Sequence, residues 1–318
     1  MIAGDPISVR VRAVEDLAPS LKRFSFEPAH GGSFPTPPAG GHVMLTLRDG
    51  ARVMKNAYSL VSPPMERTRY DIIVRLVAQS RGGSVFLHQA VRPGDVMEMA
   101  YPVSLFPLAA RAKKHLLISG GIGLTPMLSY LPELKARGAR FELHQLASGE
   151  EAPVFERLLA PYAAGEEIRV HGGGRAAFDL AGLLARQPLG THVYVCGPHS
   201  LMDAVTGTAA ALGWPAGKVH KESFGGATGG LAFRAVLARS GIEVEVGENQ
   251  TLLEAIEAAG ASAPCLCRGG ACGECVTPVI EGEVDHRDDF LSAAEKAGGK
   301  LAMICVSRAR GPRLVLDL

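Results

Sequence analysis

The sequence predicts a multidomain protein: an antiparallel β-barrel, then an α/β doubly wound domain, then a compact α+β domain. In residues 1–109, short alternating apolar and polar stretches are separated by turn residues, which is typical of an antiparallel barrel or sandwich. From about Lys113, short apolar strands alternate with helical segments, which is typical of a parallel sheet. Beyond a glycine-rich joint at 224–233 the pattern changes again.

The length, net charge, apolar runs and cysteine count of the chain limit which partners and which cellular compartment we expect. The chain has 318 residues and a net charge of +1, so we expect no nucleic-acid partner. No apolar run approaches the roughly 18–20 residues of a membrane span, and the N-terminus does not resemble a secretory signal. We therefore expect a cytoplasmic protein without a membrane partner. Its six cysteines then point to metal or redox chemistry rather than to disulfides.

Two polar motifs stand out in the first domain, whose strands are expected at 7–12, 21–28, 42–47 and 70–77. "NAYSL" (56–60) ends a further strand, and "SRGGS" (80–84) precedes a short helix. A tyrosine can lie along a flat ring and a serine can bond its edge, whereas Gly-Gly-Ser can hold a phosphate. Either motif can equally be an ordinary turn.

The second domain has expected strands at 114–120, 141–147, 167–172 and 192–197. Helices are expected at 125–138, where Pro132 interrupts the pattern, and at 153–162, 179–187 and 200–213. Gly120, Gly121 and Gly123 form a strand-to-helix turn that differs from G-x-G-x-x-G but could still admit a pyrophosphate. "CGP" at 196–198 follows a later strand, at the sheet edge where such folds bind ligands. Cys196 is either a nucleophile or a small residue at a crowded strand end.

The third domain begins with an expected hairpin at 233–246 and a helix at 251–260, which has a capping box of Thr251 and Glu254. Its cysteines follow the spacing C-x4-C-x2-C, with one more after twenty-nine residues: Cys267, Cys272, Cys275 and Cys305. This is the spacing of plant-type [2Fe–2S] ferredoxins. A four-cysteine zinc site is the alternative, although such sites usually have two C-x2-C pairs. Cys265 is interpreted as a buried neighbour.

As a set, these motifs resemble the phthalate dioxygenase reductases, which are FMN-dependent NADH reductases with a C-terminal plant-type ferredoxin. The resemblance covers nearly the whole chain and includes "YSL", "RGGS", "GGIGLTPM", "CGPHSLMD", "ESFG", "CRGGACGEC", "DHRDDFLS" and "CVSRA" in order. It implies a flavin-binding barrel (1–109), an NADH-binding domain (110–225), a linker (226–232) and a β-grasp-like [2Fe–2S] ferredoxin domain (233–318).

The resemblance also implies site residues and an electron path. Residues expected at the flavin are Asn56, Ala57, Tyr58, Ser59, Val74, Arg75, Gly82, Gly83, Ser84, Thr125 and Phe224. Residues expected at NADH are Gly120, Gly121, Gly123, Pro126, Cys196, Gly197 and Pro198. The four cysteines of the predicted spacing would ligate the cluster. Electrons would pass from NADH to FMN, to the cluster and to a terminal Rieske-type oxygenase, and no acid–base catalytic residue is required.

One position departs from the family pattern. The family usually has an arginine two residues before the tyrosine of its R-x-Y-S motif, where it helps to bind the flavin phosphate; this chain has Asn56. Lys55, Arg75 or Arg81 would have to supply the charge. FMN is expected rather than FAD because "SRGGS" matches the FMN-type branch.

Three further expectations concern the nucleotide that the chain binds, its oligomeric state and its electron acceptor. Glu150 and Glu151 follow the second strand of the parallel sheet, and they favour NADH because they would repel a 2′-phosphate. A monomer is expected. Two alternatives stay open: reduction of a P450 or a separate ferredoxin, and a non-enzymatic iron–sulfur carrier that lacks flavin.

Overall fold

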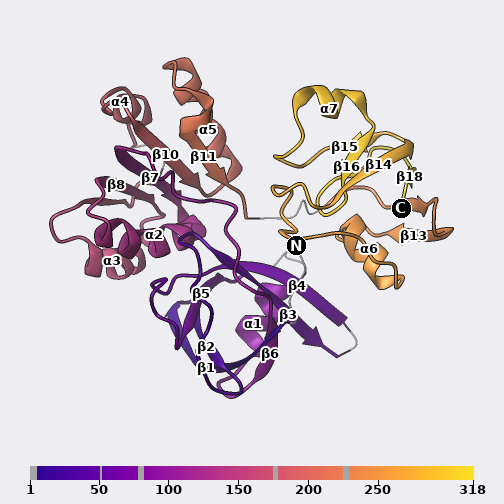
Figure 1. Cartoon of the computed structure of the whole chain (residues 1–318), viewed down its shortest axis with the longest axis horizontal. Coiled ribbons are helices and arrows are strands. Elements are labelled where there is room, and N and C mark those ends of the chain that lie inside the picture. Colours follow the sequence, from indigo (N-terminus) through magenta and orange to yellow (C-terminus); the bar gives the residue numbers. More distant parts are fainter. Residues whose placement is uncertain (1–5, 51, 78–81, 175–177, 225–228) are drawn as a thin grey trace. The chain divides into compact units, whose positions relative to one another are not determined.

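The computed structural model describes residues 6–50, 52–77, 82–174, 178–224 and 229–318. The chain divides into two compact units, of which the first ends at Ser223 and the second begins at Phe224 (Figure 1). The first unit contains the predicted barrel together with the predicted parallel sheet. The second contains the cysteine loop. No helix among the described residues is long and apolar enough to cross a membrane.

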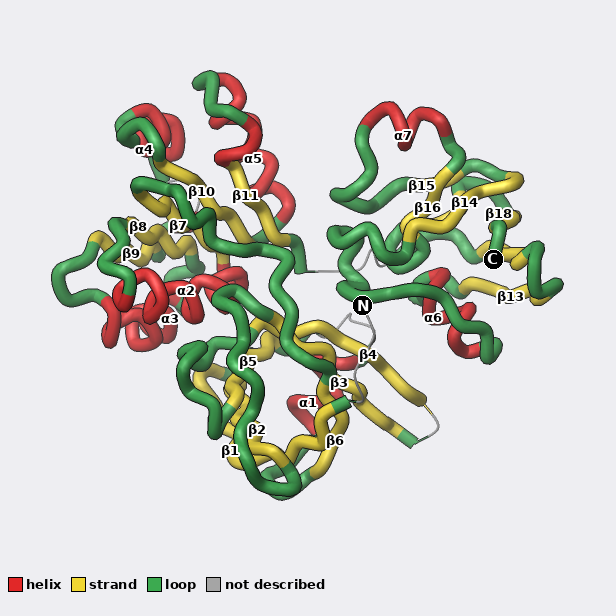
Figure 2. Tube along the Cα trace, viewed as in Figure 1, coloured by secondary structure: helices red, strands yellow, loops and turns green. Residues whose placement is uncertain are grey.

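A six-stranded antiparallel sheet opens the first unit. Its strands are β1 (Ile7–Ala18), β2 (Leu21–Pro28), β3 (His42–Asp49), β4 (Arg52–Ser59), β5 (Tyr70–Arg75) and β6 (Val96–Met99), in the order β4-β3-β6-β1-β2-β5. A bridge between Leu60 and Ile72 joins the end of β4 to β5, so the sheet closes into a barrel. Alternate residues such as Phe24 and Phe26 fill its core. Helix α1 (Gly83–Gln89) lies against the barrel (Figure 2) and buries Leu87 in that core.

The second half of this unit is a five-stranded parallel sheet. Strands β7 (Lys114–Gly120), β8 (Phe141–Leu146), β9 (Glu167–His171), β10 (Thr191–Cys196) and β11 (Val219–Glu222) run in the order β11-β10-β7-β8-β9. Helices α2 (Thr125–Ala136) and α3 (Ala152–Leu159) pack on one face, and α4 (Leu180–Ala185) and α5 (His199–Ala211) on the other (Figure 1). Short 3-10 turns lie at Gly121–Leu124, Ala160–Tyr162 and Ala216–Lys218.

The expected interruption at Pro132 is wrong, because α2 continues through it. Proline removes one backbone donor from a helix interior. Four side chains of α2 are nevertheless almost completely buried against the sheet: Leu128, Tyr130, Leu131 and Leu134. This burial stabilises the helix by more than the missing hydrogen bond costs.

The second unit is a mixed sheet with one helix packed against it. Strands β12 (Phe233–Leu237), β13 (Ile242–Val246), β14 (Val276–Glu281), β16 (Leu301–Met303) and β18 (Arg313–Leu316) run in the order β13-β12-β18-β14-β16. Helix α6 (Leu252–Ala258) has the predicted capping box of Thr251 and Glu254 and buries Leu252 and Ile256 in the core. Outside this sheet lie α7 (Ala293–Gly298) and the pair β15 (Val284–Asp285) and β17 (Arg308–Ala309). The arrangement is β-grasp-like, as predicted.

Burial of His115 on β7 gives the first unit a predicted acid sensitivity. Its side chain is only 5% exposed, and burial, followed by repulsion from His192, lowers its pKa to about 4. The unfolded chain binds a proton near pH 6.5, so the stability that His115 contributes is complete above that pH and disappears as pH falls towards 4. We expect His115→Gln to reduce the loss of unfolding free energy between pH 7 and 4 by about 2–3 kcal/mol.

The measurement for His115 is urea unfolding at several pH values. His30 is exposed, so His30→Gln is the matched control and should leave the pH dependence of the wild type unchanged. If the unfolding free energy depended on pH equally in the wild type and in His115→Gln, the acid sensitivity could not be assigned to His115.

Candidate functional site

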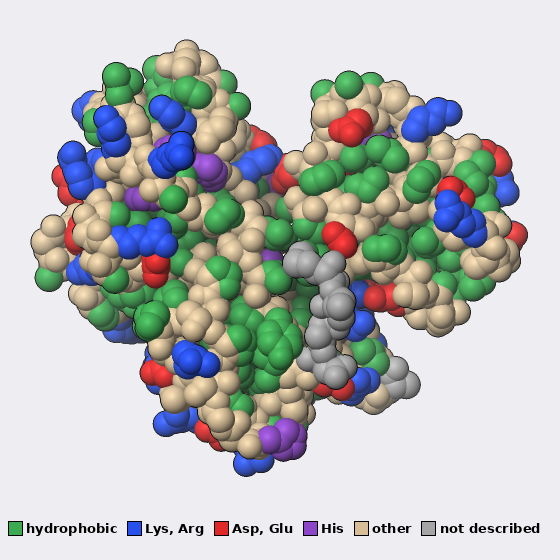
Figure 3. Space-filling model, viewed as in Figure 1, with side chains coloured by type: hydrophobic (Ala, Val, Ile, Leu, Met, Phe, Trp, Pro, Cys, Tyr) green, Lys and Arg blue, Asp and Glu red, His purple; other side chains and the backbone are tan. Residues whose placement is uncertain are grey.

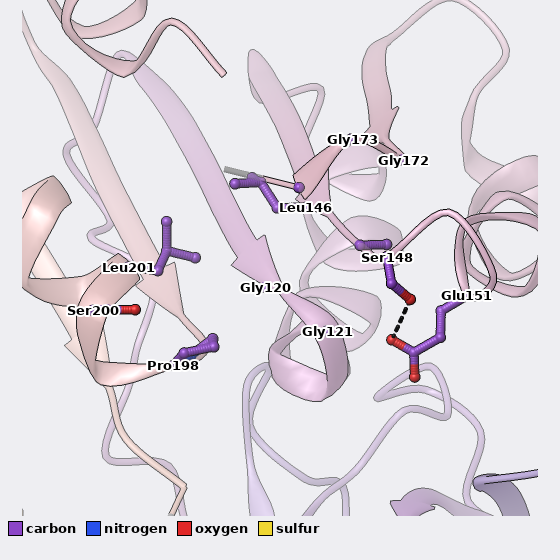
Figure 4. A pocket seen from close by; sticks show the side chains of 12 residues that line it. Gly120, Gly121, Leu146, Ser148, Glu151, Gly172, Gly173, Pro198, Ser200 and Leu201 are labelled. Atoms are coloured by element: carbon purple, nitrogen blue, oxygen red, sulfur yellow. Dashed lines mark hydrogen bonds between the residues drawn. The ribbon is translucent and has the colours of Figure 1, made fainter. Parts of the chain in front are cut away.

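A pocket opens at the carboxyl ends of four neighbouring strands of the parallel sheet, β7, β8, β9 and β10. Its volume is about 450 Å³ (Figure 4). Twelve residues line it: Gly120, Gly121, Leu146, Ala147, Ser148, Glu151, Gly172, Gly173, Gly174, Pro198, Ser200 and Leu201. Open α/β sheets bind their ligands at this edge, so the pocket is the candidate nucleotide site. The glycine run at 172–174 was not predicted, although a glycine cluster directly after a strand was visible in the sequence.

The two predicted nucleotide motifs pack directly against each other beside this pocket. A Cβ atom on Gly123 would lie 2.2 Å from the carbonyl oxygen of Cys196, and one on Gly120 would lie 2.9 Å from Cδ of Pro198. Gly121 has φ +54°, which favours glycine. Only glycine therefore allows the two turns to approach this closely. Thr125 and Pro126 follow as the first residues of α2, and the Thr125 hydroxyl donates to the Ile122 carbonyl.

Cys196 is fully buried at the end of β10. Burial, and secondarily the charge of Glu222, raises the pKa of its thiol well above the ordinary value. A thiol in these surroundings stays protonated and is a poor nucleophile. Of the two interpretations of Cys196, the structure favours the small residue at a crowded strand end.

An ion pair connects the barrel to the nucleotide pocket within the first unit. Nη2 of Arg75, at the end of β5, lies 2.7 Å from Oε1 of Glu151, which lines the pocket. The Ser148 hydroxyl donates to the other carboxylate oxygen of Glu151 at 3.4 Å (Figure 4). Glu150 is exposed and does not line the pocket. Of the two predicted glutamates, only Glu151 therefore lines the candidate nucleotide pocket.

The predicted flavin residues of the barrel lie on β4, at the end of β5 and at the start of α1. Asn56, Ala57, Tyr58 and Ser59 belong to β4, and Val74 and Arg75 end β5. A Cβ atom on Gly83 would lie 2.6 Å from Nδ2 of Asn56, so the glycine motif of α1 packs on β4. The structure thus brings together motifs that are more than twenty residues apart in the sequence.

Two serines of the flavin prediction differ in their surroundings. The Ser59 hydroxyl is buried and has no hydrogen-bond partner among the described residues, which fits a group that receives a ligand. The Ser84 hydroxyl instead accepts a bond from the backbone N–H of Val77 at 3.1 Å. Phe224 is 43% exposed at the start of the second unit. Arg81 lies outside the described residues.

The cysteine loop of the second unit is built for close approach of backbone to sulfur. The N–H of Gly269 donates to Sγ of Cys267 at 3.3 Å, and Sγ of Cys275 lies 3.1 Å from Sγ of Cys305. Arg268 has φ +52° and pairs with Glu257 of α6. All six cysteines of the chain are free thiols. Such N–H donors and a nearby cation suit sulfur ligands that carry negative charge.

Contacts among the four predicted ligands perturb their acidity in opposite directions. A hydrogen bond from Cys272, followed by one from Cys305, lowers the pKa of Cys267, and the same contacts raise the pKa values of Cys272 and Cys305. The four thiols therefore form one connected group, which fits a cluster bound by four thiolates. No set of three or more His, Cys, Asp or Glu side chains in the described part of the chain is arranged to hold a single metal ion.

Cys265 lies outside this group. Its side chain is half-buried and not fully buried as predicted. Burial is the main cause that raises the pKa of its thiol to about 11, whereas hydrogen bonds among the thiols are the main influence on the pKa values of the four predicted ligands. Phe290 was not predicted to be near the cysteines. A Cβ atom on Gly273 would lie 2.3 Å from its ring, which is 50% exposed. No sequence signal links these two residues.

A barrel with a candidate flavin face, a nucleotide pocket and a four-cysteine loop together define an electron-transfer reductase. Comparison with known proteins places it more narrowly. Residues 236–310 match the family model "2Fe-2S iron-sulfur cluster binding domain". Residues 102–219 match "Dimethylamine monooxygenase subunit DmmA-like, N-terminal domain".

Similar proteins align over almost the entire chain. The heme-dependent oxidative N-demethylase beta subunit of Ectopseudomonas mendocina (strain ymp) is 46% identical over 98% of this chain and 99% of its own. The carnitine monooxygenase reductase subunit of Escherichia coli (strain K12) is 44% identical over 98% of each chain. A solved structure, titled phthalate dioxygenase reductase, a modular structure for electron transfer from pyridine nucleotides to [2Fe–2S], is 36% identical and covers 98% of each chain at a TM-score of 0.84.

The chain belongs to the phthalate dioxygenase reductase family. This membership confirms the predicted fold class and the predicted oxidoreductase that serves an oxygenase. It also confirms the cofactor set of FMN, a [2Fe–2S] cluster and NADH. The cluster interpretation thereby replaces the zinc alternative for the cysteine loop.

Proposed function

We propose that this reductase supplies electrons to a Rieske-type terminal oxygenase that oxidises or demethylates a small amine. The observation that carries the proposal is the ordering of the similar proteins. Those named for N-demethylation or carnitine oxidation are 43–46% identical to this chain, whereas the phthalate and vanillate reductases are 36–38% identical. Partner surfaces change together with the partner, so the closer group is the better guide.

Within this proposal, residues 1–109 hold FMN, 110–225 hold NADH, 226–232 form the linker and 233–318 hold the cluster. Bound FMN would supply the conversion between the two-electron hydride of NADH and a cluster that takes one electron at a time. The chain's own residues bind and orient the carriers. Tyr58 and the buried Ser59 hydroxyl face the isoalloxazine, and the paired turns at Gly121–Gly123 and Cys196–Pro198 hold the nucleotide.

The first test is an anaerobic absorption spectrum of the purified protein, followed by titration with NADH. We expect flavin bands with a red-brown iron–sulfur shoulder, both bleached by about three electrons per chain. Cluster absorbance without flavin bands, before and after addition of FMN, would contradict the flavin part of the proposal.

The partner is tested by coupling the reductase to purified oxygenases. Oxygenase components of the carnitine and phthalate systems are mixed with the reductase and their substrates, and substrate-dependent NADH oxidation is measured. We expect coupled turnover at least about tenfold faster with the carnitine oxygenase, because docking complementarity determines partner choice. Faster turnover with the phthalate oxygenase would contradict the amine assignment.

A heme-containing oxygenase is the second candidate partner. The 46% identical protein is named as the beta subunit of a heme-dependent N-demethylase, which is the observation favouring it. Addition of the catalytic subunit of that demethylase to the same assay separates the two candidates. Reduction of its heme by NADH through this chain would favour the heme partner over the Rieske-type one.

The choice of NADH over NADPH depends on Glu151 in this proposal. Its carboxylate lines the pocket and would repel the 2′-phosphate of NADPH. We expect Glu151→Gln to raise kcat/KM for NADPH relative to NADH about tenfold, because it removes the repulsion and frees Arg75 to attract phosphate. The exposed Glu150 provides the matched control, since Glu150→Gln makes the same charge change outside the pocket. An unchanged NADH preference in Glu151→Gln would contradict the role of Glu151.

The proposed working state is a cytoplasmic monomer. None of the six cysteines forms a disulfide, and four of them are assigned to the cluster, which suits a reducing compartment. On the face drawn in Figure 3, basic and acidic side chains are interspersed, which suits a protein without a nucleic-acid partner. Light scattering of the loaded protein during size-exclusion chromatography should give a mass near 33.4 kDa.

A further inference from the structure

The sequence does not identify the cation that would neutralise the phosphate group of the proposed FMN. Asn56 stands where related reductases carry an arginine, and its amide bears no charge. In the structure this amide packs directly against Gly83, the first residue of α1. Another cation must therefore balance a phosphate held beside Gly82 and Gly83.

Three cations were considered from the sequence, of which Arg81 lies outside the described residues and the other two face elsewhere. Lys55 is exposed on β4 between Met54 and Asn56, so its side chain leaves the opposite face of the strand. Arg75 pairs with Glu151 at the nucleotide pocket. Neither side chain is directed at the two glycines.

Arg52 lies on the correct face of the same strand. Side chains alternate along a strand, so Arg52, Met54 and Asn56 share one face. Met54 packs in the barrel core, whereas Arg52, the first residue of β4, is exposed. A Cβ atom on Gly82 would lie 3.2 Å from Nη1 of Arg52 and 3.4 Å from Sδ of Met54. The guanidinium thus lies beside the glycine motif that the sequence predicts to hold the phosphate.

We propose that Arg52 supplies the positive charge for the flavin phosphate, in place of the arginine that related reductases carry at position 56. The inference rests on the proposed function, because it requires FMN in the barrel. A guanidinium binds phosphate through paired N–H donors, and the two glycines leave room for the phosphate to approach. Asn56 keeps the packing contact with Gly83, while the charge enters from Arg52, four residues earlier on the same face.

The test compares FMN with riboflavin, which lacks the phosphate. Flavin is removed from the full-length protein, and both dissociation constants are measured by quenching of flavin fluorescence at two salt concentrations. We expect Arg52→Gln to weaken FMN binding about ten- to hundredfold and to change riboflavin binding less than about threefold. The salt dependence of FMN affinity should decrease in the same variant.

Two further variants sharpen the comparison. Arg48 on β3 pairs with Glu98 at the surface, so Arg48→Gln makes the same charge change away from the glycines and should leave both affinities unchanged. Lys55→Gln tests the rival cation. A selective loss of FMN binding in Lys55→Gln and not in Arg52→Gln would overturn the inference. Equal weakening of FMN and riboflavin by Arg52→Gln would also overturn it, because that result indicates a structural role.

Wild-type behaviour separates failure of the inference from failure of the proposed function. Tight FMN binding that Arg52→Gln leaves intact would refute the role of Arg52 and leave the reductase proposal standing. A wild type that binds neither FMN nor riboflavin would refute the flavin part of the proposed function, and the inference with it.

Discussion

Replacing Cys305 with serine is expected to abolish cluster incorporation. Cys305 is buried beside Cys275 and belongs to the connected group of four thiols. A cluster bound by four thiolates loses affinity steeply when one ligand is changed, and the folding energy that the cluster contributes is lost with it. Iron and acid-labile sulfide should fall to background. NADH-driven reduction of the oxygenase should fall at least about a hundredfold.

The effect of Cys305→Ser should be confined to the second unit. Small dyes that accept electrons from the flavin should still be reduced at rates within about twofold of the wild type, because the predicted nucleotide residues and all predicted flavin residues except Phe224 belong to the first unit. Cys265→Ser is the matched control, since this cysteine lies two residues from the first ligand but outside the group. Loss of the cluster in Cys265→Ser and its survival in Cys305→Ser would reverse the ligand assignment.

Substituting alanine for Gly123 is expected to disable the nucleotide pocket. The added Cβ atom would lie 2.2 Å from the Cys196 carbonyl oxygen, so one of the two turns must move. Overpacking of backbone against backbone should lower the free energy of unfolding by about 2–4 kcal/mol. The KM for NADH should rise at least about tenfold, because both turns are proposed to hold the nucleotide. Steady-state kinetics and urea unfolding measure the two effects.

Gly207 provides the control for Gly123. It lies exposed inside α5, and a Cβ atom there would meet nothing within 4 Å. Gly207→Ala should therefore raise the free energy of unfolding by about 0.5–1 kcal/mol and leave the KM for NADH unchanged. If both alanine variants behaved alike, the close approach of the two turns would not be the cause.

Strong local patterns predicted most secondary structure. β2 and β7 begin and end at the predicted residues, and the capping box of α6 is present. The elements that the sequence failed to predict, or predicted wrongly, have physical explanations. β6 and β11 have four residues each, too few for a periodic pattern to emerge. Pro132 misled the prediction because local propensity contains no information about the burial of α2.

Site residues that follow a fixed spacing in the sequence could be predicted. Contacts between side chains that are distant in the sequence could not. The four cysteines follow from sequence spacing alone. The pairing of Arg75 with Glu151 depends on how the end of β5 meets the start of α3, and the position of Arg52 beside Gly82 depends on how β4 meets the start of α1. Those contacts join segments that are distant in the sequence, and no short motif encodes them. Lys55 was a candidate from its position in the chain, and strand alternation places it on the face of β4 opposite to Asn56.

The central position of β18 has a consequence for biosynthesis. This strand pairs with both β12 and β14 in the middle of the second sheet, although it is the last of the five to be synthesised. The sheet cannot form until the ribosome has made residues 313–316. All strands of the first unit precede Ser223 and can fold earlier, because domains fold as units during synthesis. We therefore expect the cluster to be loaded late in maturation, after the flavin unit has folded.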